Sequence, residues 1–274
     1  MNDSHVSLLS LWNWHSPMWL VALAAVVAYV WVHRRHGGLT GQAGFFVAAL
    51  AAFLVATVSP INRLAYGYLF SAHMVHHLLL LLVVPGFLLV SISPAVAAAA
   101  LRLPAVARFN KAFSYPLLGW AMGAGAMWFW HVPTFCVASQ TIGAVSDLQT
   151  ASLLVLGLGF WSPICSPDAS VRLTGLRGVA YLFLGCLACT ALGIYLTFSP
   201  VSVCPSFAVA ADPLGITPYL RNTLGLDVMT DQKLGGLLMW VPACAIYMVA
   251  SATLLIKWFG RPADMSDFTP APVK

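Results

Sequence analysis

Long apolar runs separated by short polar segments dominate the chain, and seven of them are long enough, or nearly so, to cross a membrane. We place the seven predicted membrane helices at about 18–32, 43–59, 72–92, 116–133, 148–164, 178–197 and 235–256. The expected fold class is therefore all-α, a polytopic membrane protein with a bundle of seven transmembrane helices. We treat residues 1–274 as a single membrane domain, with an extracytoplasmic loop at about 198–234 and a flexible cytoplasmic tail at about 260–274.

Composition supports this class and excludes several functions. Hydrophobic residues make up 60% of the chain and charged residues only 8%, against about 25% charged residues in soluble domains. All eight acidic residues are aspartates, which leaves little material for a catalytic pair of carboxylates. The chain has no phosphate-binding loop, dinucleotide fingerprint, HExxH or GxSxG motif. We therefore expect no enzyme and, because the basic residues lie in short loops rather than on one face, no nucleic-acid partner.

The loop charges predict the orientation in the membrane. Alternate loops hold ten Lys and Arg residues on one side and three on the other, namely Arg63, Arg221 and Lys233. The positive-inside rule then puts the amino terminus outside and the carboxyl terminus in the cytoplasm.

Three histidines open the third predicted helix, in the string SAHMVHHLLLLLVVP. His73, His76 and His77 stand at positions i, i+3 and i+4, which point to the same side of a helix. Ionisable groups inside membrane helices face the protein interior and mark functional sites. The predicted orientation puts this stripe on the outer side.

Two other predicted helices bring candidate residues to the same outer face. His131 ends the fourth helix, whereas Asp231 and Gln232 precede the seventh. Met239 lies about two turns inside the seventh helix, where simple packing is the alternative to metal binding.

These residue types fit a copper site. Imidazole binds late first-row metals, thioether favours Cu(I), and a carboxylate can bind the ion or orient a histidine. We predict copper, as Cu(I), bound by His73, His77 and His131 with Asp231 assisting, while His76 supports a ligand or faces the loop. The alternatives are histidines that hydrogen-bond to backbone and water, and an Asp231 that only complements a helix dipole.

The cysteines leave two questions open. Cys136 and Cys204 both lie on the predicted outer side, where disulfides form, so a bridge between them is one possibility. Cys186 and Cys189 form a C-x-x-C motif in the sixth helix, and Cys244 lies in the seventh. A Cu(I) relay through these three thiols competes with plain packing, because cysteine is also a small apolar residue.

Three strings carry a family likeness: SAHMVHHLLLLLVVP at 71–85, WFWHVP at 128–133 and DQKLGGLLMWVP at 231–242. With their spacing over seven predicted helices, they resemble the Bacillus-type CtaG family of cytochrome c oxidase assembly proteins. The chain is also distantly similar to the membrane domain of CopD-type copper-resistance proteins. Glutamine stands in the family where this chain has His76, which favours His73 and His77 as the shared pair.

The resemblance implies a non-catalytic assembly factor for a haem–copper oxidase, in the inner membrane of a bacterial cell. Its partners would be the lipid bilayer and oxidase subunits or other assembly factors, and homo-oligomerisation stays open. Three alternatives remain: a copper transporter, a haem-binding protein with two axial histidines, and a structural partner of the oxidase without metal.

Overall fold

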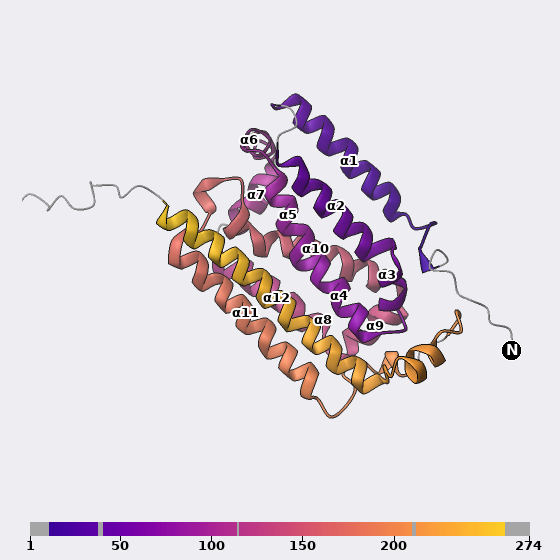
Figure 1. Cartoon of the computed structure of the whole chain (residues 1–274). Helices are drawn as coiled ribbons and strands as arrows, with labels where there is room; N and C mark the ends of the chain where they lie inside the picture. Colours follow the sequence, from indigo (N-terminus) through magenta and orange to yellow (C-terminus); the bar gives the residue numbers. More distant parts are fainter. Residues whose placement is uncertain (1–10, 38–40, 114, 210–211, 261–274) are drawn as a thin grey trace, which may run out of the picture.

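The computed structural model describes residues 11–37, 41–113, 115–209 and 212–260, and within these ranges it contains helices and no β-strand (Figure 1). The predicted tail beyond Gly260 lies outside the described residues. The α-helices are α1 (Met18–Arg35), α2 (Ala43–Val58), α3 (Pro60–Ala65), α4 (Phe70–Leu78), α5 (Val84–Ser91), α6 (Pro94–Ala100), α7 (Pro104–Phe113), α8 (Pro116–Trp130), α9 (Pro133–Thr141), α10 (Gly143–Cys165), α11 (Gly175–Phe198) and α12 (Val228–Phe259).

All seven predicted membrane helices are helical in the structure. Five helical segments are long and apolar enough to cross a membrane: Met18–Arg35, Phe70–Ser91, Gly143–Cys165, Gly175–Phe198 and Val228–Phe259. The other two predicted membrane helices correspond to α2 and α8, which have 16 and 15 residues. The number of crossings and the direction of the chain through the membrane stay predictions.

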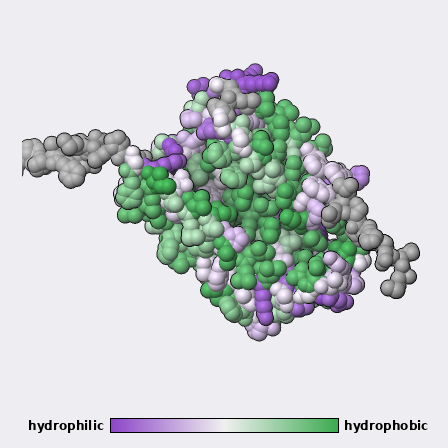
Figure 2. All heavy atoms as spheres, in the orientation of Figure 1, coloured by the Kyte–Doolittle hydropathy of each residue, from purple (hydrophilic) through white to green (hydrophobic). Residues whose placement is uncertain are grey.

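The helices form a bundle in which α4, α5 and α10 occupy the centre and α1 lies at one edge, packed on α2 (Figure 1). The longest interface joins α11 to α12, and α12 also packs on α4. Apolar side chains cover much of the visible face, with hydrophilic groups gathered toward its edges (Figure 2). Leu20, Phe198 and Ile256 are at least 70% exposed, as expected for side chains that contact lipid.

The central membrane helix is interrupted by one π-helical turn. Residues Leu79–Val83 adopt this wider turn between α4 and α5. Gly157 on α10 allows the close approach, because a Cβ there would lie 2.5 Å from the carbonyl oxygen of Leu81 and 2.7 Å from Cγ of Pro85. Such turns are frequent beside functional sites.

The last helix begins earlier than the sequence predicted. It starts at Val228 rather than near 235, and its N-cap Asp227 accepts hydrogen bonds from the backbone N–H groups of Met229 and Thr230. The predicted boundary was wrong because the polar residues at 230–233 are typical of a loop. In the structure they belong to the helix, and the side chains of Asp231 and Gln232 bond to other segments. Asp231 therefore lies inside the first turns of α12, and the predicted loop at 198–234 ends at Asp227.

Candidate metal centre

Four histidines meet at one end of the bundle, and we call them the histidine cluster: His73, His76, His77 and His131. The first three lie on α4, and His131 is the C-cap residue of α8. Their exposed fractions are 0%, 0%, 0% and 3%. The ring centroids of His73 and His77 lie 4.2 Å apart, and those of His77 and His131 lie 5.2 Å apart.

The three histidines of α4 satisfy the geometry of a metal site. One ring nitrogen from each of His73, His76 and His77 lies within 4.8 Å of the others. This grouping follows from their spacing along one helix turn. His76, which the family likeness made the weaker candidate, lies as deeply buried as its neighbours.

Most nitrogens of these rings have no hydrogen-bond partner. Both nitrogens of His76, both of His77 and Nε2 of His73 are buried and unbonded among the described residues. A neutral imidazole carries one donor and one acceptor, and buried polar groups in proteins are nearly always paired. His76 and His77 thus each offer one lone pair without a competing hydrogen bond. In His73, Nδ1 accepts from the Gln140 amide, so Nε2 carries the hydrogen of the neutral ring and would have to lose it to bind a metal ion.

Two glutamines that the sequence analysis did not single out, Gln140 and Gln149, flank the histidine cluster. Gln140 of α9 accepts a hydrogen bond from the backbone N–H of Gly67 at 3.1 Å and donates to Nδ1 of His73 at 3.2 Å. Gln149 of α10 is fully buried next to His77, and neither atom of its amide makes a hydrogen bond. No motif marks either glutamine, because the residues next to them, Gly67, His73 and His77, lie far away in the sequence, on α4 and on the segment before it.

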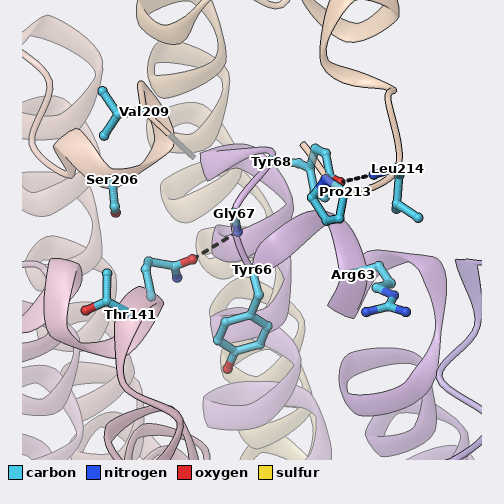
Figure 3. A pocket seen from close by; sticks show the side chains of 10 residues that line it. Arg63, Tyr66, Gly67, Tyr68, Thr141, Ser206, Val209, Pro213 and Leu214 are labelled. Atoms are coloured by element: carbon cyan, nitrogen blue, oxygen red, sulfur yellow. Dashed lines mark hydrogen bonds between the residues drawn. The ribbon is translucent and has the colours of Figure 1, made fainter. Parts of the chain in front are cut away.

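A pocket of about 440 Å³ opens beside the cluster (Figure 3). It is lined by Arg63, Tyr66, Gly67, Tyr68, Gln140, Thr141, Ser206, Val209, Pro213 and Leu214. Figure 3 shows the hydrogen bond from the N–H of Gly67 to the side chain of Gln140, both of which line this pocket. Because Gln140 both lines the pocket and bonds to His73, its side chain separates the pocket from the buried imidazoles.

The structure places Asp231 at the start of α4 rather than among the rings of the cluster. Its Oδ2 accepts a hydrogen bond from the N–H of Phe70 at 2.7 Å, and its Oδ1 accepts from the N–H and the hydroxyl of Ser71 at 3.2 and 2.5 Å. Arg221 lies 3.9 Å from the same carboxylate. A negative charge at a helix N-terminus is favoured by the helix dipole, so Asp231 of α12 fixes the start of the histidine-bearing helix.

The loop between α11 and α12, residues 199–227, covers this end of the bundle, and we call it the covering loop. Arg221 holds it in place. Its guanidinium donates hydrogen bonds to the carbonyl oxygens of Leu226, Tyr68 and Phe207. The Phe207 ring in turn lies 5.8 Å from the His73 ring, between centroids. The loop thereby places an aromatic side chain over the cluster.

Gln232 and a disulfide bond fix the same covering loop at other points. The Gln232 carbonyl oxygen accepts from the N–H of Val203, and its amide nitrogen donates to the carbonyl oxygens of Leu196 and Val201. Cys204 forms a disulfide bond with Cys136 of α9, one of the possibilities that the sequence left open.

Among the described residues, the intramembrane cysteines and Met239 make no hydrogen bond to the cluster. Cys186 of α11 is bonded to Cys244 of α12, and Cys189 remains a free thiol. Two of the three thiols that a Cu(I) relay would need are therefore joined to each other. Met239 is fully buried in α12.

The donor set suits a borderline or soft metal ion. Neutral imidazoles with free lone pairs bind copper and zinc, whereas magnesium and calcium need oxygen ligands. Among the described residues, no acidic oxygen belongs to the group of candidate ligand atoms on His73, His76 and His77. Both oxygens of Asp231 are already hydrogen-bonded.

Comparison with known proteins identifies the same family that the sequence strings at 71–85, 128–133 and 231–242 suggested. The family described as cytochrome c oxidase caa3 assembly factor (Caa3_CtaG) matches residues 10–261. No curated protein and no solved structure matches the chain. Since the match covers nearly the whole sequence, the chain belongs to the family of cytochrome c oxidase caa3 assembly factors.

Proposed function

We propose that the histidine cluster is a copper site, and that this assembly factor binds Cu(I) there on the outer side of the bacterial inner membrane and delivers it to an oxidase subunit. The observation that carries the proposal is the set of five buried, unbonded imidazole nitrogens on His73, His76 and His77. The role is one of binding and transfer, without catalysis.

The energetics favour a ligand in the cluster. Each buried polar atom without a partner costs about 1–3 kcal/mol, so five such atoms are a large cost for a fold of ordinary stability. A bound metal ion would replace the missing hydrogen bonds with coordination. The folded chain would then be stabilised by the metal, because the unfolded chain does not hold the rings together.

The pocket beside the cluster supplies a route for the ion. It adjoins the covering loop, and two of its lining side chains, Gln140 and Tyr66, contact the histidines: Gln140 bonds to His73, and the Tyr66 ring lies 5.4 Å from that of His76 between centroids. Rotation of the Gln140 side chain would break two hydrogen bonds and open the way to the imidazoles. An oxidase subunit could receive the ion at the same pocket.

The test is the metal content of the purified full-length protein after loading with Cu(I) under reducing conditions. We expect about one copper per chain in the parent, and much less in His73→Ala, His77→Ala and His131→Ala. His15→Ala is the matched control, because His15 is exposed and lies outside the cluster. A parent protein that binds no copper would contradict the proposal.

Two further measurements separate this proposal from its alternatives. A Soret band in the purified protein would indicate haem, which Cu(I) bound to histidine does not produce. Copper flux into sealed vesicles would indicate transport, and retention of copper at the cluster without flux supports delivery. In cells, oxidase assembly that survives loss of the copper-binding histidines would favour a structural partner instead.

A further inference from the structure

The sulfur atom of Met74 contacts the histidine cluster. No pattern in the sequence had marked this methionine as a candidate ligand. It lies on α4 directly after His73 and is fully buried. Gly235 of α12 lies against this part of α4: a Cβ at that position would lie 2.6 Å from Cδ1 of Phe70 and 3.2 Å from Cγ of Met74. The thioether lies against the ring of His131, with Sδ 3.1 Å from Nε2.

The proton on His131 is assigned by its other nitrogen. Nδ1 lies 2.5 Å from the carbonyl oxygen of Met127, and a carbonyl oxygen can only accept, so Nδ1 carries the hydrogen. In the neutral ring Nε2 is then a bare lone pair. It faces the sulfur of Met74, which also has no hydrogen to donate.

Two lone-pair donors at this distance are well placed to share a positive centre. A second proton on the ring would supply one, but it would bury a positive charge beside three other histidines. The carboxylate at this end of the bundle, that of Asp231, is paired with Arg221 instead. A metal ion is also charged, but it would be coordinated by several neutral donor atoms at once, whereas a proton on Nε2 would be shared with the sulfur alone. Metal–nitrogen and metal–sulfur bonds of about 2.0 and 2.3 Å put two neighbouring ligands about 3.1–3.6 Å apart for angles of roughly 90–110°, which includes the observed separation.

We propose that Met74 Sδ and His131 Nε2 bind the same ion, so that the centre is a mixed imidazole–thioether site selective for Cu(I). His77 supplies the adjoining nitrogen ligand, since its ring lies 5.2 Å from that of His131 and neither of its nitrogens is bonded. Thioether sulfur is a soft ligand that favours Cu(I) over Zn(II). This inference rests on the proposed copper-binding function and adds its selectivity and a ligand.

The test compares Met74→Leu with the parent protein in lipid nanodiscs. Leucine has a similar volume and no sulfur, so it preserves packing. We expect the Cu(I) affinity, measured by competition with a chromophoric chelator, to fall by at least about tenfold. The Zn(II) affinity should stay within about threefold, because the histidine nitrogens remain. Met239→Leu is the matched control, a buried methionine of α12 that should leave both affinities unchanged.

X-ray absorption at the copper edge gives a direct readout of the ligand. The Cu(I)-loaded parent should show sulfur scattering beside nitrogen scattering, and Met74→Leu should lose the sulfur contribution. A parent with nitrogen ligands alone, or a sulfur signal that persists in Met74→Leu, would overturn the inference while leaving copper binding intact. Absence of copper from the parent would instead refute the proposed function itself.

Discussion

Replacement of Asp231 by asparagine tests whether this residue fixes the start of α4 or binds metal. The carboxylate accepts three hydrogen bonds, from the N–H of Phe70 and from the N–H and hydroxyl of Ser71. Hydrogen bonds to a charged group contribute about 1.5–3 kcal/mol each. Asparagine keeps one accepting oxygen and turns an amide NH₂ toward a donor, so we expect a loss of about 2–4 kcal/mol, because the three bonds share one carboxylate and do not add fully.

The assay is thermal unfolding of the metal-free protein, followed by tryptophan fluorescence. With about 2–4 °C of melting temperature per kcal/mol for a chain of this size, Asp231→Asn should melt about 4–16 °C lower than the parent. Below that temperature it should still bind copper. Asp227→Asn is the matched control, since Asp227 is an exposed cap of α12 and should change melting less. An Asp231→Asn protein that melts like the parent yet loses copper would refute the structural role and make the carboxylate a ligand.

Three further predictions concern the pocket, the covering loop and pH. Gln140→Ala should accelerate copper loading several-fold in a stopped-flow measurement, because it removes one of the side chains between pocket and cluster; an unchanged rate would argue against this route. Cys136→Ser should destabilise the protein by about 4 kcal/mol, since the bond to Cys204 closes a separation of 68 residues; equal denaturation midpoints with and without the bond would contradict this. Hydrogen bonds from the Thr230 hydroxyl and N–H hold the pKa of Asp227 below its usual value, so its stabilising effect is complete above about pH 4 and is lost as the pH falls through the lowered pKa. Asp227→Asn should therefore flatten the acid side of the stability profile, and an identical acid side would count against that assignment.

Local periodicity was enough to predict the seven apolar helical segments and the histidine stripe, but not the short helices α3, α6, α7 and α9. The spacing of His73, His76 and His77 depends only on helix geometry, and apolar length alone located all seven segments that prove helical. The position of His131 at the same end followed from the predicted alternation of helix direction.

Contacts between distant segments were beyond this reasoning. Asp231 bonds to residues 160 and 161 positions away, so nothing in its own neighbourhood indicated that it begins another helix. The same holds for the bond of Arg221 to Tyr68, 153 positions away, and for the bonds of Gln140 to Gly67 and His73. The start of α12 was missed for a related reason: polar side chains that normally indicate a loop are satisfied there by tertiary hydrogen bonds.

The π-helical turn at Leu79–Val83 lets α4 and α5, on either side of it, face different neighbours. One extra residue in a helix turn rotates everything beyond it by about 100° relative to a straight α-helix. His77 above the turn faces the cluster, while Pro85 below it meets Gly157 of α10. A continuous α-helix would satisfy one of these two interfaces and turn the other toward lipid. The turn therefore lets the imidazoles of α4 face one another while α5 packs on α10. A one-residue deletion within the turn would misdirect one of these two sets of side chains.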